Sequence, residues 1–75
     1  MEKMTIELSK EEKISIINQH IKTLKYNKYD YQISIKEEEA VETPSASRVG
    51  SLNAKVAEVD AKVAVLSAEI VLLNA

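Results

Sequence analysis

Hydrophobic residues in the C-terminal half of the chain recur at alternating spacings of three and four. The pattern runs without a break and comprises Val49, Leu52, Val56, Val59, Val63, Leu66, Ile70 and Leu73. A strict period of seven is typical of a helix that supercoils around a partner helix. The pattern therefore predicts a coiled-coil helix over residues 49–74.

The N-terminal half carries a second, less regular pattern of the same kind. Lys28 replaces the expected apolar residue at one position, and the other positions are Ile14, Ile17, Ile21, Leu24, Tyr31 and Ile35. Upstream, Ser9 and Glu12 match a capping box, in which the two side chains bond to backbone N–H groups left free at a helix start. Together these features predict an amphipathic helix over residues 9–41.

A break in the helical pattern lies between these two segments. It contains several serines and the only proline, Pro44, and it ends near the only glycine, Gly50. Such residues predict a turn, over residues 42–48. The chain is then an all-α, antiparallel two-helix coiled-coil hairpin. A centred turn pairs Ile17 with Leu73, Ile21 with Ile70, Leu24 with Leu66, Tyr31 with Val59 and Ile35 with Val56. It leaves Lys28 facing Val63, with its ammonium at the edge of the core, where Asp60 or Glu69 is its candidate partner.

Acidic residues are concentrated around the end of the first predicted helix, at Glu37, Glu38, Glu39 and Glu42. Negative charge near a helix C-terminus is mildly unfavourable, because the carbonyl end of the helix is itself partly negative. We therefore expect these carboxylates to have a salt partner, such as Lys36, Arg48 or another chain.

Residues 1–8 precede the first predicted helix and alternate in polarity. Met4, Ile6 and Leu8 are the apolar positions, a pattern that suits a short extended arm laid on a neighbour. The N-terminus lacks the basic and then apolar stretch of a secretory signal. The longest apolar segment is interrupted by charges and is shorter than the roughly 20 residues that span a bilayer. We expect a soluble chain with no membrane partner.

The C-terminal helix carries a second apolar face. Its small residues form their own stripe at three and four spacing, and larger apolar residues extend it: Ala54, Ala57, Ala61, Ala64, Ala68, Val65, Val71 and Leu72. Alanine is also a common surface filler, because it is the best helix former. The larger residues favour burial, since an isolated hairpin would expose them. The face predicts self-association into a helical bundle, with a dimer as first choice and a trimer as second.

The composition excludes most catalytic chemistry. The 75 residues include no cysteine, and His20 is the only histidine. Thiol nucleophiles and thiolate metal sites are therefore excluded. A single histidine with no carboxylate three or four residues away lacks the partners for a zinc site or for acid–base catalysis. We expect a non-enzymatic protein with no catalytic residue, metal site or cofactor.

Positive charges and aromatic rings alternate within the first predicted helix, at Lys22, Lys25, Tyr26, Lys28 and Tyr29. Such rings can stack on nucleic-acid bases. The patch is small, and the net charge of −2 argues against attraction of the whole chain to phosphate backbones. The alternative is a polar helix face whose tyrosines cover a neighbouring helix and keep their hydroxyls in water. Nucleic-acid binding is the remote alternative.

Two stretches of the chain carry a family resemblance. The segment LKYNKYDYQISIKEEEAV, followed by the turn and then SLNAKVAEVDAKVAVLSAEI, resembles small helical proteins of tailed phages that infect marine cyanobacteria. The resemblance covers residues 4–74. It implies a phage origin and a helical hairpin, and it brings no activity, cofactor or catalytic residue.

The sequence thus predicts a coiled-coil structural or assembly protein, a phage accessory or virion component found in the host cytoplasm or the virion. The alternative is an adaptor that binds a host or phage protein through one helical face. Self-association predicts an oligomer of the isolated chain, whereas an adaptor predicts a monomer until its partner is present.

Overall fold

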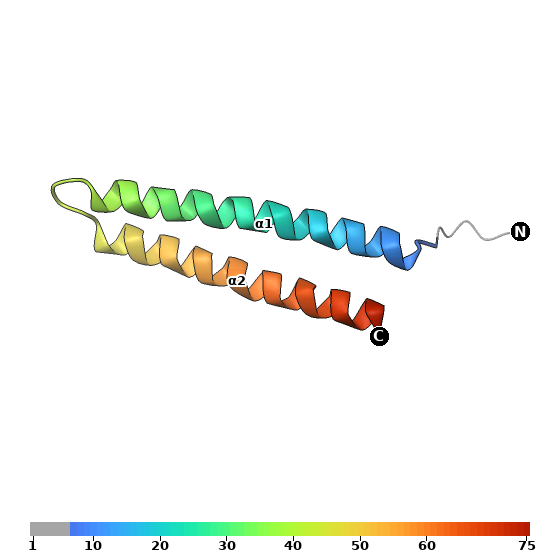
Figure 1. Cartoon of the computed structure of the whole chain (residues 1–75). Helices are drawn as coiled ribbons and strands as arrows, with labels where there is room; N and C mark the ends of the chain where they lie inside the picture. The colour runs from blue at the N-terminus through green and yellow to red at the C-terminus, as the bar shows by residue number, and fades with distance from the viewer. Residues whose placement is uncertain (1–6) are drawn as a thin grey trace, which may run out of the picture.

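The computed structural model describes residues 7–75, which form two antiparallel helices joined by a short turn (Figure 1). Helix α1 spans Lys10–Glu39 and helix α2 spans Ala46–Asn74, and no strand occurs in this part of the chain. The all-α helical hairpin predicted from the hydrophobic pattern is confirmed. Its principal extents of 65 × 26 × 15 Å describe an elongated rod.

Helix α1 begins with the predicted capping box. The backbone N–H of Glu12 donates to Ser9 Oγ at 3.1 Å, and the backbone N–H of Ser9 donates to Glu12 Oε1 at 2.8 Å. Two N–H groups at the helix start are thereby satisfied by side chains. Of the predicted arm over residues 1–8, Met4 and Ile6 lie outside the described residues.

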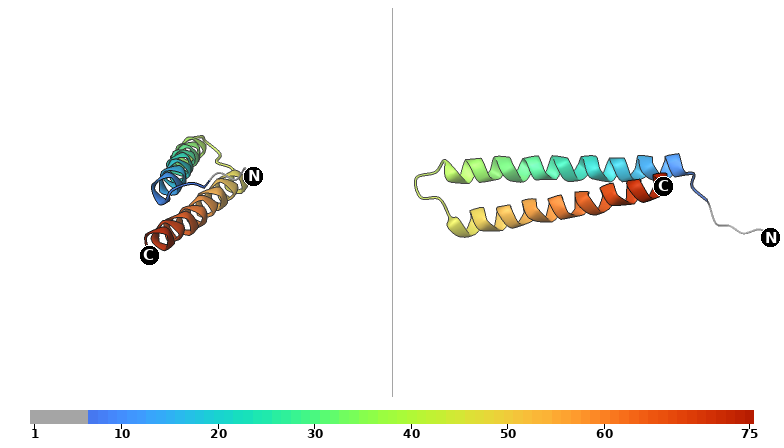
Figure 2. Two further views of the ribbon diagram at one scale, coloured as in Figure 1. Left: turned by 90° about the vertical axis from the view of Figure 1, so that its right-hand side faces the viewer. Right: turned by 60° about the horizontal axis from the view of Figure 1, so that its bottom comes forward.

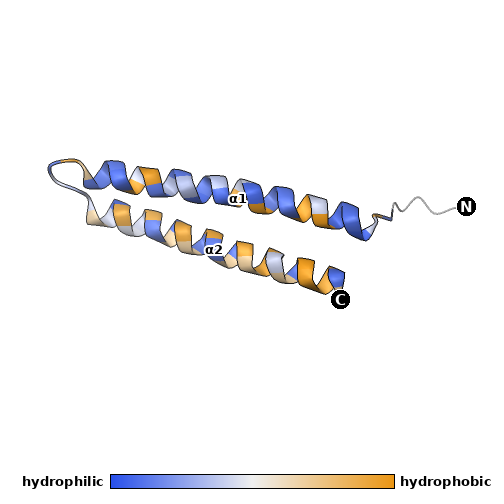
Figure 3. Ribbon diagram, viewed as in Figure 1, coloured by the Kyte–Doolittle hydropathy of each residue, from blue (hydrophilic) through white to orange (hydrophobic). Residues whose placement is uncertain are grey.

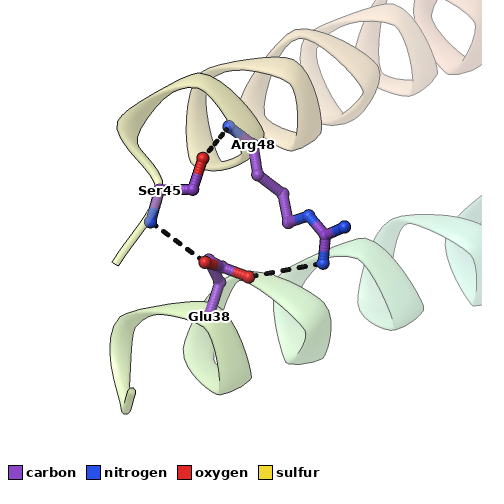
Figure 4. Close-up of polar contacts among 3 residues, drawn as sticks. All are labelled: Glu38, Ser45 and Arg48. Carbon is purple, nitrogen blue, oxygen red and sulfur yellow. Dashed lines mark hydrogen bonds and ion pairs between the residues drawn. The ribbon is translucent and has the colours of Figure 1, made fainter. Parts of the chain in front are cut away.

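The turn is held by one carboxylate. Glu38 Oε2, on α1, accepts a hydrogen bond from the backbone N–H of Ser45 at 3.0 Å. The other oxygen of the same carboxylate, Oε1, forms an ion pair with Arg48 Nη1 at 3.5 Å (Figure 4). Arg48 is thus the salt partner expected for the acidic end of α1. Ser45 Oγ in turn accepts from the backbone N–H of Arg48 at 3.2 Å and caps α2.

Both helix boundaries at the turn differ from the predicted ones. Helix α2 begins at Ala46 rather than at Val49, because Ser45 satisfies an N–H group of a turn that the sequence pattern assigns to the connection. Helix α1 ends at Glu39, two residues before the predicted end at Val41. The connection therefore covers residues 40–45, so it begins two residues and ends three residues before the predicted turn over residues 42–48.

The two helices lie side by side along their length, as the three views together show (Figures 1 and 2). Val59 is the one buried residue among residues 7–75, with 6% of its surface exposed. The remaining core positions of the two helices are only half-buried: Ile14, Ile17, Ile21, Leu24, Lys28, Tyr31, Ile35, Val49, Leu52, Val56, Val63, Leu66, Ile70 and Leu73. The row of core residues on each helix is its seam. Each helix covers one side of the other's seam and leaves the flanks of that seam exposed.

Two of the predicted core pairs line shared grooves. Ile17 lies with Leu73 at the open end of the hairpin, and Leu24 lies with Leu66 farther along. Antiparallel packing about the turn thus brings together residues more than forty positions apart in the sequence.

We expect Val59→Ala to destabilise the hairpin more than any other single valine truncation along the seam. Loss of two buried methyl groups removes about 1.5 kcal/mol of hydrophobic stabilisation. Val41→Ala is the matched control, because it deletes the same atoms from a half-exposed side chain beyond the end of α1. Thermal unfolding followed by circular dichroism measures both. Equal losses in the two variants would contradict the position of Val59 at the centre of the packing.

Candidate interaction surfaces

Helix α2 turns a continuous apolar face away from α1. This outer face of α2 consists of eight exposed residues: Ala54, Ala57, Ala61, Ala64, Val65, Ala68, Val71 and Leu72. The two valines and the leucine are 67–68% exposed, so the hairpin leaves most of their surface in water. The residues predicted from spacing as a second face are thus placed together. The hydropathy colouring shows that α2 is the more hydrophobic helix along most of its length (Figure 3).

The outer face continues into a groove between the helices. Ala61, Val65 and Leu66 of α2 line it from one side, and His20 and Leu24 of α1 line it from the other. His20 is exposed there and has no carboxylate among the other groove residues. Gln19, Thr23 and Lys62 complete the lining of the groove.

A second apolar patch lies at the open end of the hairpin and includes Leu8 of the predicted arm. Leu8 and Ile16 are exposed there beside Ile17 and Leu73. The signal was present in the sequence, because Ile16 and Ile17 are adjacent and a helix cannot turn both toward the same seam. This patch extends the uncovered apolar surface of the rod to its free end.

The structure brings together four of the five residues of the predicted lysine and tyrosine patch. Lys22, Lys25, Tyr26 and Tyr29 line one shallow groove on α1. Tyr26 and Tyr29 are 69% and 64% exposed, so α2 does not cover their rings. Lys28 is the exception, because its side chain points to the other helix.

Lys28 occupies a core position and forms an ion pair across the hairpin. Its Nζ lies 2.7 Å from Asp60 Oδ1, with the two side chains 34% and 56% exposed. Asp60 is three residues nearer the turn than Val63, the predicted neighbour. A pair this exposed contributes less than about 1 kcal/mol. A polar residue in a hydrophobic seam lowers stability and favours one alignment of the helices.

Within residues 7–75, no group of three or more His, Cys, Asp or Glu side chains gathers in a way that could hold a metal ion. Neither helix contains a stretch long and apolar enough to cross a membrane.

Comparison with family models, with curated proteins and with solved structures finds no match to this chain. Among the surfaces of the hairpin, the outer face of α2 has the most apolar residues. Exposed apolar patches of soluble proteins are commonly covered by a partner.

We expect Lys28→Leu to raise the stability of the hairpin by about 1 kcal/mol, because an apolar side chain replaces a charged one at a half-buried core position. Asp60→Asn is the control: it removes only the exposed ion pair and should change stability by less than about 1 kcal/mol. Chemical denaturation measures both. A loss of stability in Lys28→Leu would show that the ion pair outweighs the packing.

Proposed function

We propose that the protein is a non-enzymatic structural or assembly protein whose hairpins self-associate into a helical bundle through the outer face of α2. A homodimer that forms a four-helix bundle is the simplest such assembly. The observation that carries the proposal is the burial: one residue, Val59, is buried within residues 7–75 of the single chain.

A pair of helices with one buried residue lacks the hydrophobic core that offsets the loss of conformational entropy on folding. Covering a valine or leucine fully contributes about 1.5–3 kcal/mol. Val65, Val71 and Leu72 together could therefore add several such contributions once a second surface covers them. Self-association supplies what the hairpin alone lacks.

The setting of the proposal follows from the resemblance of residues 4–74 to small phage proteins. That resemblance gives the proposed role as a phage accessory or virion component, acting in the host cytoplasm or in the particle. An adaptor that binds another protein through the same face is the second candidate. The same exposed apolar residues favour it, and the test below separates the two.

The first test is the solution mass of the full chain by light scattering coupled to size exclusion, over about a tenfold range of concentration. The proposal predicts twice the 8.4 kDa mass of the chain, with the monomer appearing on dilution. An 8.4 kDa species at every concentration would contradict self-association and leave the adaptor as the account of the exposed face.

A matched pair of variants locates the interface. Ala61→Arg places a long charged side chain in the middle of the outer face, and arginine is a good helix former, so the helix itself is little affected. Gln32→Arg places the same side chain at an exposed position of α1. We expect the first to reduce the mass toward that of the monomer and the second to leave it unchanged. An unchanged mass in Ala61→Arg would mean that the alanines are surface filler.

A further inference from the structure

Four charged residues form a row along one edge of the outer face of α2. Lys55, Glu58, Lys62 and Glu69 are separated by three, four and seven residues, which places them on one side of a helix. All four are exposed. The ion pairs found within residues 7–75 join Lys28 to Asp60 and Arg48 to Glu38, and so involve none of them.

The signs in this row alternate from positive to negative, and reading the row backwards inverts every sign. We propose that a second copy of this chain docks on the outer face with the two α2 helices antiparallel and the symmetry axis close to Ala61. Lys55 then lies beside Glu69 of the second copy, and Glu58 lies beside Lys62 of the second copy. Each contact occurs twice, as two-fold symmetry requires.

The parallel alternative leaves these charges without complementary partners. In a parallel pair the two-fold axis runs along the helices and puts the rows of the two copies on opposite sides of the contact, so the rows do not meet. The charge order therefore favours the antiparallel arrangement, in which both rows lie on the same side and opposite charges pair. Asp60, on the opposite edge, has its charge already engaged by Lys28 at 2.7 Å.

The shape of the face is compatible with this docking. Alanines at the line of contact allow helix axes to approach to about 8 Å, the short end of the usual range. The line extends back to Gly50, which has ordinary helical backbone geometry, and a Cβ built there meets nothing within 4 Å. The hairpin itself thus gives Gly50 no role, and a helix laid along this line meets only small side chains until Val71.

This inference rests on the proposed self-association, and disulfide cross-linking tests it separately. The chain has no cysteine, so single-cysteine variants report unambiguous contacts. A disulfide requires Cα atoms within about 7 Å. Ala61→Cys lies at the symmetry axis and should form covalent dimers under mild oxidation. Ala54→Cys and Ala68→Cys should not do so alone, because each lies about 21 Å along the helix from its own copy.

An equimolar mixture of the Ala54→Cys and Ala68→Cys chains should form the mixed covalent dimer, since these positions face each other across the antiparallel pair. Gln32→Cys, at an exposed site on α1, reports the background of random collisions. Each variant is first shown by light scattering to keep the wild-type mass under reducing conditions.

Covalent dimers of Ala54→Cys alone, formed as fast as those of Ala61→Cys, would establish a parallel pair and overturn the inference. An oligomer in which none of the three alanine positions cross-links above background would also overturn it, while leaving self-association intact. A wild-type chain that is monomeric throughout would instead overturn the proposed function, and the antiparallel dimer with it.

Discussion

Two helices packed side by side can cover each other along only one stripe each, and this constraint governs the whole molecule. In a larger bundle each seam is enclosed by two or more neighbours. Here the seams of α1 and α2 have one neighbour each, so the core positions are half-buried and Val59 alone is enclosed. The elongated shape, the exposed apolar face and the proposed assembly all follow from this incomplete burial of the core residues.

The polar contacts of the hairpin determine its geometry more than its stability. The Ser9 and Glu12 box fixes where α1 begins, and the Glu38 carboxylate ties the end of α1 to the first turn of α2. Lys28 and Asp60 join the helices near their middle. Because Arg48 and Asp60 remain 69% and 56% exposed, each ion pair contributes little free energy. They select one hairpin among several alignments that a repetitive seam would otherwise permit.

The sequence predicts the helices well because their causes are local. The seven-residue period and the capping box need no knowledge of the partner helix. The predicted start of α2 is three residues late because the hydrophobic pattern begins at Val49, whereas the Ser45 cap allows the helix to begin at Ala46. The Lys28 contact with Asp60 depends on how far a flexible side chain reaches, which spacing does not specify. The spacing of the residues is enough to predict the outer face of α2. It does not identify the partner that covers this face, because the pattern describes only one of the two surfaces in contact.

If a second copy supplies the burial that the single hairpin lacks, as proposed, folding and self-association are coupled. The most direct measurement is thermal unfolding of the full chain by circular dichroism across about a hundredfold range of protein concentration. Folding coupled to dimer formation predicts a midpoint that rises steadily with concentration. A midpoint that stays constant over that range would show that the hairpin folds alone, and it would contradict the claim that a second copy completes the structure.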